Sequence, residues 1–377
     1  MTHRNLALDV FRGLTVAGMI LVNTPGSWSH IYPPLRHAVW HGYTPTDLVF
    51  PFFLFISGAA MWFSLKKVTP DEAFKPWAFK IMRRAVLIFV IGLSLNAFPF
   101  YDLDLSKLRI MGVLQRIGLA YGIAGLLVLS VRVRSNLTGD HEKVLMILSM
   151  VILAGYQIVL VVFGSDDPYG LETNIVRAVD LSLFGASHLW QGTGTSFDPE
   201  GLLSTAPAAV SVIMGYLTSR WISNAKSPAA MARGLALAGV GCLVFGMIWG
   251  QSMPINKALW TSSYVMVTTG WALIVLGILV FLIDIMNVKR WCWVAGVFGS
   301  NPLFSYVLSI VWVKIYLAIS LTDTDGGPIS LYGWIYWKGF EPLFGALHGS
   351  FLFAVVHVGI FWLAALVLYR RKIFIKI

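Results

Sequence analysis

Residues 35–58 read LRHAVWHGYTPTDLVFPFFLFISG and change within a few positions from a polar loop to an apolar segment. The polar half contains two histidines, an arginine and Asp47. From Leu48 onward no side chain is charged until Lys66, and about 20 helical residues cross a hydrocarbon layer roughly 30 Å thick. The stretch therefore predicts a membrane helix that begins directly after a histidine-bearing loop.

The composition of the whole chain agrees with this prediction. Of 377 residues, 57% are apolar and only 12% are charged, whereas an ordinary soluble domain has about a quarter charged residues. Together with this first stretch, the apolar runs of the chain give about ten candidate spans, each of the length that a bilayer requires. They lie near residues 6–27, 46–65, 80–98, 110–130, 144–164, 202–222, 231–250, 262–284, 292–313 and 349–369. We therefore expect an all-α integral membrane protein with about ten transmembrane helices.

The basic residues predict how these spans are oriented. Lysine and arginine gather before the first span, after the last, and in the gaps after the second, fourth, sixth and eighth spans. Since positive loops stay in the cytoplasm, both termini are expected there. The extracytoplasmic loops are then about 28–45, 165–201 and 314–348 of a single transmembrane domain, 1–377. This topology accounts for the net charge of +10, so nucleic-acid binding is not expected.

Polar residues inside membrane helices are costly, and the first span has several of them. Asp9 and Arg12 are three residues apart on one helical face, near its cytoplasmic end, and Asn23 is near the outer end. One interpretation is an ion pair that closes the helix bundle. The other is that Arg12 binds a phosphate entering from the cytosol, because a guanidinium binds phosphate bidentately.

A second intramembrane arginine is predicted in the fourth span, where Gln115 and Arg116 lie below its outer end. An unpaired arginine at that depth is unfavourable, so Arg116 must meet a carboxylate, a carbonyl or a ligand. Asp47 is a natural candidate partner. As a carboxylate at a helix N-terminus, Asp47 is also favoured by the helix dipole.

The first extracytoplasmic loop contains His30, His37 and His41. A histidine can exchange a proton near neutral pH or act as a nucleophile. The apolar neighbours of His37, which include Trp40, indicate that it packs against the bundle, where a nearby carboxylate could fix its tautomer. The spacing of the three histidines matches no common zinc pattern, so no metal is expected.

Several segments together resemble one enzyme family along the whole chain. They are LDVFRG (8–13), RHAVWHGYTPTDLVFPFFLFISG (36–58), GVLQRIG (112–118), DPEG (198–201), INKALWTSSYV (255–265) and YRRKIFIKI (369–377). In these motifs the chain resembles the heparan-alpha-glucosaminide N-acetyltransferase family and its bacterial relatives. The resemblance implies a transmembrane acyltransferase domain, with acetyl-CoA in the cytosol as donor and the amine of a glucosamine-type sugar across the membrane as acceptor.

The resemblance also implies roles for individual residues. The active histidine of the family corresponds to His37, followed here by Ala38, Trp40 and Gly42, and the family's asparagine late in the first helix corresponds to Asn23. We expect His37 to be nucleophile or general base, Asp47 to orient it, and Asn23 to bind the carbonyl oxygen in the transition state.

The remaining candidates are expected to bind the two substrates. Arg12 is expected to bind acetyl-CoA, together with Gln115 and Arg116. The acceptor sugar, which could stack on an aromatic ring, is expected to meet residues on the outer side. These are Trp40, Asp198, Glu200, Asn256, Lys257 and Trp260.

Two other classes of function stay open. A multispan transporter of an anionic or sugar solute would also have intramembrane Arg and Asp, although no pair of broken helices stands out in the sequence. A non-catalytic scaffold for envelope polysaccharide assembly would leave His37 structural. The expected partners besides the substrates are the lipid bilayer, which we expect to be a bacterial inner membrane, and a second copy in a homodimer, which no motif requires.

Overall fold

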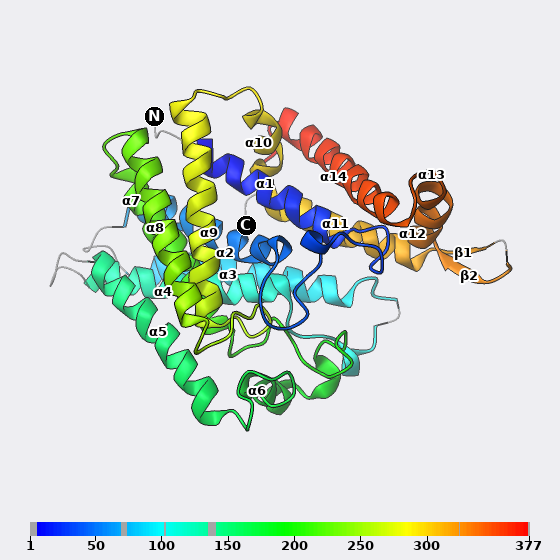
Figure 1. Cartoon of the computed structure of the whole chain (residues 1–377), viewed down its shortest axis with the longest axis horizontal. Coiled ribbons are helices and arrows are strands. Elements are labelled where there is room, and N and C mark those ends of the chain that lie inside the picture. Colours follow the sequence, from blue (N-terminus) through cyan, green and yellow to red (C-terminus); the bar gives the residue numbers. More distant parts are fainter. Residues whose placement is uncertain (1–5, 69–73, 102, 135–140, 324, 376–377) are drawn as a thin grey trace.

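The computed structural model describes residues 6–68, 74–101, 103–134, 141–323 and 325–375. Its helices are α1 (Leu6–Asn23), α2 (Val49–Leu65), α3 (Phe74–Ala97), α4 (Val113–Arg134), α5 (His141–Phe163), α6 (Ile175–Phe184), α7 (Thr205–Ser223), α8 (Pro228–Trp249), α9 (Ser262–Val280), α10 (Cys292–Ser300), α11 (Pro302–Ala318), α12 (Leu331–Trp334), α13 (Glu341–Phe344) and α14 (Ala346–Arg370). Two strands, β1 (Ser320–Thr322) and β2 (Pro328–Ser330), pair antiparallel. The mostly helical architecture confirms the all-α prediction (Figure 1).

Each of the ten expected spans coincides with a long helix or, at 292–313, with the pair α10 and α11. Within the described residues, seven segments are long and apolar enough to cross a membrane. They contain α1, α2, α4, α5, α8, α9 and α14. The pair α10 and α11 forms an eighth if the two helices are counted as one span. The orientation of the termini stays a prediction, and Arg4 and Lys376, two of the basic residues on which it rests, lie outside the described residues.

The stretches expected to span at 80–98 and 202–222 form the long helices α3 and α7, which do not pass the same test of length and hydropathy. Basic side chains gather in the first half of α3, including Arg83 and Arg84. Helix α7 is rich in Ala, Ser and Thr, and most of its residues are buried among other helices. Because such a helix contacts little lipid, its surface does not need to be strongly apolar.

The ninth expected span, 292–313, is broken. Helices α10 and α11 meet at Asn301 with a bend of 76°. Asn301 is fully buried, and its side chain binds the backbone of the C-terminal segment at Ile373 and Ile375. No pair of broken helices was expected, and the described residues contain one broken span, where a buried asparagine followed by Pro302 interrupts the apolar run.

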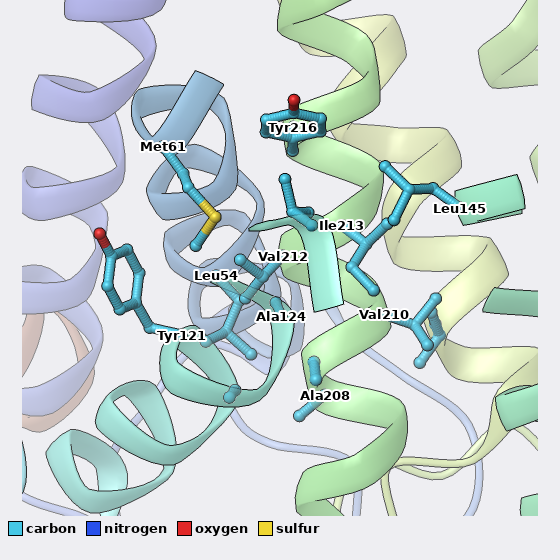
Figure 2. Packing of buried hydrophobic residues seen from close by; sticks show 14 of the residues in the cluster. Leu54, Met61, Tyr121, Ala124, Leu145, Ala208, Val210, Val212, Ile213 and Tyr216 are labelled. Atoms are coloured by element: carbon cyan, nitrogen blue, oxygen red, sulfur yellow. The ribbon is translucent and has the colours of Figure 1, made fainter. Parts of the chain in front are cut away.

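Close helix packing depends on small residues at the crossing points. Helices α2 and α7 approach so closely that a Cβ on Gly58 would lie 1.8 Å from the carbonyl oxygen of Val212, and a Cβ on Gly215 would lie 1.8 Å from that of Phe55. Small residues allow such contact between membrane helices, where van der Waals packing drives association. Figure 2 shows the side chains of α2, α4 and α7 that fill the adjoining core, including Leu54.

The segments expected as long loops contain structure of their own. Residues 165–201 include α6, and residues 314–348 include the β1–β2 hairpin, α12, a π-helical turn η7 (Ile335–Phe340) and α13. Figure 1 shows the hairpin projecting from one end of the molecule and α6 lying apart from the long helices. The segment before α2 contains two 3₁₀ turns, η1 (Pro33–Leu35) and η2 (Pro45–Leu48), and the second of these leads into the candidate site.

Candidate functional site

His37 and Asp47 form the centre of the candidate site. Nδ1 of His37 lies 2.6 Å from Oδ1 of Asp47. Since a carboxylate can only accept a hydrogen bond, Nδ1 carries the proton in this contact, and Nε2 of the neutral ring has a free lone pair. Nε2 makes no hydrogen bond with any described residue, and the His37 side chain is 43% exposed. The ring is thus held on one side and accessible on the other.

The local sequence explains why Asp47 is fixed. Asp47 lies in η2, where its Oδ2 accepts hydrogen bonds from the backbone N–H groups of Ala38 and Thr44, each at 3.0 Å. Thr44 and Asp47 form a capping box at the start of this turn. The hydroxyl of Tyr264 in α9 donates to the Asp47 carbonyl at 2.5 Å. With its side chain only 1% exposed, Asp47 is a fully bonded carboxylate.

The histidine loop is attached to the segment before α9. Gly42 has a φ of +91°, a conformation that L side chains rarely adopt. Its N–H donates to the carbonyl of Ile255 at 2.7 Å. This link brings the next residues of the segment, Asn256 and Lys257, to the loop. The Asn256 side chain is buried and accepts from the N–H of Leu259, so it shapes the segment rather than facing a substrate.

Lys257 joins the histidine–aspartate pair. Its Nζ lies 3.3 Å from Oδ1 of Asp47 and 3.0 Å from Nδ1 of His37. Burial lowers the pKa of Lys257, and its ion pair with Asp47 offsets this effect only in part. As an ammonium, Lys257 has no acceptor, so with Nδ1 protonated its hydrogen bond goes to Asp47. The three side chains form one connected group drawn from the first loop, η2 and the segment before α9.

A cavity of about 990 Å³ connects this group with the opposite end of the bundle. Its wall includes Arg12 and Asn23 on α1, and Val49 and Ala60 on α2. At a rise of 1.5 Å per residue, each of these pairs spans about 16 Å along its helix. His37, Asp47 and Lys257 line the same cavity. One continuous space therefore extends from the histidine through the helix bundle.

The end of the cavity away from His37 is basic. Arg12 lines it, donates to Asp9 at 3.2 Å and to the carbonyl of Gly299 at 3.4 Å, and is 23% exposed. The expected ion pair is therefore present, and it leaves Arg12 in contact with the cavity. Arg84 lines the same end, with its guanidinium 4.8 Å from the ring centroid of Tyr121. Among the described residues, the buried Nε of Arg84 has no hydrogen-bond partner.

The middle of the cavity is apolar, and its histidine end is aromatic and polar. Apolar side chains of α1, α2, α3 and α4 line the middle, including Met19 and Ile117. Trp28 and Trp190, which are 63% and 38% exposed, line the other end with Trp40. Trp40 is fixed by a hydrogen bond from its Nε1 to the carbonyl of Tyr169 at 2.8 Å. The aromatic end thus combines one fixed and two exposed indole rings.

An ion-pair network supports this wall. Arg109 binds Asp198 with both Nε and Nη2, at 2.8 and 2.7 Å, and Glu200 with Nη2 at 2.6 Å. Burial acts to lower the pKa of Arg109, but these two carboxylates outweigh it and raise the pKa above its usual value. Arg109 and Glu200 line the cavity, whereas Asp198 lies behind them, fully buried.

The expected roles of Gln115 and Arg116 in acetyl-CoA binding do not match their positions. Neither residue lines the cavity. Gln115 donates to the carbonyl of Ile110, and Arg116 donates to the hydroxyl of Ser204 and to the carbonyl of Gly201. Asp47 is therefore not the partner of Arg116. The sequence alone could not show that the turn before α7, which contains Gly201 and Ser204, lies against Arg116 inside the helix bundle.

Trp260 and Asn256 are likewise not part of the cavity wall. Trp260 is fully buried, with its ring between Phe50 and Tyr264 and 5.0 Å from the guanidinium carbon of Arg116. It cannot offer a face to a sugar in this structure. The indole rings that are exposed in the cavity and could stack on a sugar are instead those of Trp28 and Trp190, two tryptophans in loops.

Arg84 is the main residue that the sequence analysis missed. In the sequence it is one of the basic residues that bear on the topology. A signal was present, because Arg83 and Arg84 are followed directly by an apolar run and one face of the helix must turn inward. Arg83 is exposed, whereas Arg84 faces the cavity.

Comparison with known proteins shows which enzyme family the chain resembles. A family model described as "Heparan-alpha-glucosaminide N-acetyltransferase, catalytic" matches residues 4–171, a range that includes His37, Asp47 and Arg84. The human protein named heparan-alpha-glucosaminide N-acetyltransferase is 27% identical to the chain, over 98% of the chain and 59% of the human protein. The mouse protein of the same name is also 27% identical, over 100% of the chain and 61% of the mouse protein.

The chain thus spans about three fifths of the length of these two relatives. The alignments nevertheless extend over essentially the whole chain, and the family model covers the helices that carry the histidine loop and the basic end of the cavity. On these matches, the chain is similar to the heparan-alpha-glucosaminide N-acetyltransferase family, in residues 4–171 by the family model and along its whole length by the two relatives.

Proposed function

We propose that this protein transfers an acetyl group from acetyl-CoA, bound at the Arg12 and Arg84 end of the cavity, to the amine of a glucosamine-type sugar at the His37 end. The observation that carries the proposal is the single cavity lined by both arginines and by His37. A thioester on a long pantetheine arm can follow such a space, and its apolar middle excludes water from the reactive group.

The basic end suits the phosphates of CoA. A guanidinium binds phosphate through paired N–H donors, and Arg84 has a buried Nε without a protein partner among the described residues. By the distribution of basic residues this end faces the cytoplasm. Arg12 therefore stays a proposed CoA-binding residue, and Arg84 takes the place of Gln115 and Arg116 in the proposal.

His37 is the proposed nucleophile or general base. Asp47 holds Nδ1, so Nε2 is the nitrogen that can attack the thioester or remove a proton from the acceptor ammonium. Asn23 also lines the cavity, and its side-chain amide makes no hydrogen bond with any described residue. It can donate to the carbonyl oxygen as that atom gains charge, a contribution of about 3 kcal/mol in comparable sites.

The acceptor sugar would bind between the exposed indole rings of Trp28 and Trp190 and the carboxylate of Glu200. Aromatic rings stack on the apolar faces of sugars, and a carboxylate attracts an ammonium group. Trp40 and Lys257 would complete the wall. Asp198 and Asn256 would act only by holding neighbouring residues.

The test is release of CoA and formation of an N-acetyl sugar by purified protein, scanned over glucosamine-bearing acceptors. His37→Ala should abolish both, and the matched control His41→Ala, four residues away and outside the cavity wall, should retain them. Wild-type turnover by His37→Ala would refute the proposed role of His37.

A carrier without acyl-transfer chemistry is the second candidate, because the break at Asn301 and a cavity that connects two ends also suit transport. Uptake of a solute by reconstituted vesicles, in the absence of any CoA ester, would support the carrier. The same vesicles should show no such uptake if the protein is an acyltransferase alone.

A further inference from the structure

Lys257 places a primary amine beside the residue that handles the acetyl group. Its Nζ lies 3.0 Å from Nδ1 of His37, and its side chain is 23% exposed and lines the same cavity. The functional group of Lys257 is the same as that of the proposed acceptor, an amine attached to carbon. A bound thioester that reaches His37 therefore also comes within reach of Lys257.

The environment of Lys257 favours the uncharged amine more strongly than the environment of a surface lysine does. Burial lowers its pKa, while the ion pair with Asp47 at 3.3 Å opposes this effect and holds the ammonium in place. Asp47 does not depend on Lys257 alone, because Ala38, Thr44 and His37 also donate to it. Lys257 can thus lose its proton while the carboxylate stays hydrogen-bonded.

We propose that Lys257 is an internal acetyl acceptor, which becomes N-acetylated when acetyl-CoA is bound and no sugar is present. This inference rests on the proposed acetyl transfer. The C–S bond of the thioester breaks and an amide C–N bond forms at Nζ. The lysine ammonium gives up two protons, of which one ends on the CoA thiol and the other passes through His37 to solvent.

The modification would change the site. An amide carries no charge and does not release acetyl readily, so Asp47 would lose its ion pair and the cavity would lose a cation. We therefore expect acetylation to switch off turnover slowly when the acceptor is scarce. A bound sugar would compete with Lys257 for the acetyl group and protect the enzyme.

The experiment uses purified full-length protein in detergent, incubated with acetyl-CoA without a sugar. Peptide mass spectrometry should find one acetyl group on Lys257 that survives hydroxylamine, which removes acetyl from a histidine. Because proximity raises the effective concentration of the amine, its occupancy should exceed that of Lys314 by about tenfold. Lys314 is the matched control, since it is partly buried but donates to backbone carbonyls, including that of Leu95, outside the cavity wall.

Three further measurements separate the outcomes. Glucosamine should reduce the labelling of Lys257, and His37→Ala should remove it. After preincubation with acetyl-CoA, Lys257→Arg should acetylate the sugar as fast as the same variant does without preincubation. The wild type should acetylate it more slowly after preincubation than before. Sugar acetylation by a protein whose Lys257 stays unmodified would overturn this inference and leave the proposed function intact. Absence of any acetyl transfer would overturn both.

Discussion

Nδ1 of His37 lies 2.6 Å from Oδ1 of Asp47, although the two residues belong to a loop and to the turn that precedes a membrane helix. The aspartate is fixed by two backbone N–H groups and by the segment before α9. This arrangement selects the ring nitrogen that faces the cavity, and most of the expectations below depend on it.

Asp47→Asn should lower kcat by about 10²–10⁴, as is found when the carboxylate that orients a catalytic histidine becomes an amide. The amide can present either atom to Nδ1, so the tautomer is no longer fixed. Steady-state kinetics should show smaller changes in both KM values. The control Asp104→Asn changes an exposed carboxylate that only caps its own turn. A wild-type kcat for Asp47→Asn would show that the pair is structural.

Arg84→Gln should raise KM for acetyl-CoA by about 10–100-fold, the effect of losing a hydrogen bond to a charged group. KM for the sugar should change little, because Arg84 lines the end of the cavity away from His37. The matched control is Arg83→Gln, which alters the exposed neighbour on the same helix. Equal effects on both substrates would instead indicate a structural role for Arg84.

Asp180 should make the fold sensitive to pH. It is fully buried in α6, its Oδ1 accepts from the N–H of Leu202 at 2.9 Å, and burial raises its pKa to about 6. Because this pKa lies above that of the unfolded chain, the neutral form favours folding. Its contribution is complete below about pH 4 and is lost as the pH rises through 6, a change of about 3 kcal/mol.

Asp180→Asn should therefore be more resistant to thermal unfolding than the wild type at pH 8, with a smaller difference at pH 4.5. Thermal unfolding of the two detergent-solubilised proteins, monitored by tryptophan fluorescence at pH 8 and at pH 4.5, measures these differences. Asp166→Asn, in an exposed position of the same segment, is the control. A difference between wild type and Asp180→Asn that does not change with pH would contradict the assignment.

Gly58→Ala should destabilise the protein by about 1–3 kcal/mol, the usual result of overpacking a close contact. Its new Cβ would lie 1.8 Å from the backbone oxygen of Val212, so α2 and α7 would have to move apart. In Gly155→Ala the new Cβ meets no atom within 4 Å, and this control should be neutral or slightly stabilising. Equal unfolding temperatures for the two variants would contradict the described crossing.

The local features of the site could be predicted from the sequence, because they depend on near neighbours. Asp47 follows Thr44 at the spacing of a capping box, and it lies ten positions after His37. The apolar runs likewise predicted where the long helices lie. Hydropathy alone could not show that α7 would be covered by other helices, or that Asn301 would bend the ninth span by 76°.

The partners of distant polar residues could not be predicted. Arg116 required a partner, but the choice among a carboxylate, a carbonyl and a ligand depended on which loop reached it, and the structure shows Ser204 and Gly201. Trp260 was expected to meet the acceptor sugar, yet it packs against Arg116 in the interior. Such contacts join segments about 85 to 145 positions apart, where periodicity and propensity carry no information.

The most direct test of the central claim is acetyl transfer across a sealed membrane. Protein of one orientation in vesicles should form N-acetyl sugar when acetyl-CoA is present only on the side of Arg12 and Arg84, and the glucosamine acceptor only on the side of His37. Vesicles with His37→Ala should form none. Product that appears only when both substrates are on the same side would contradict transfer through the cavity.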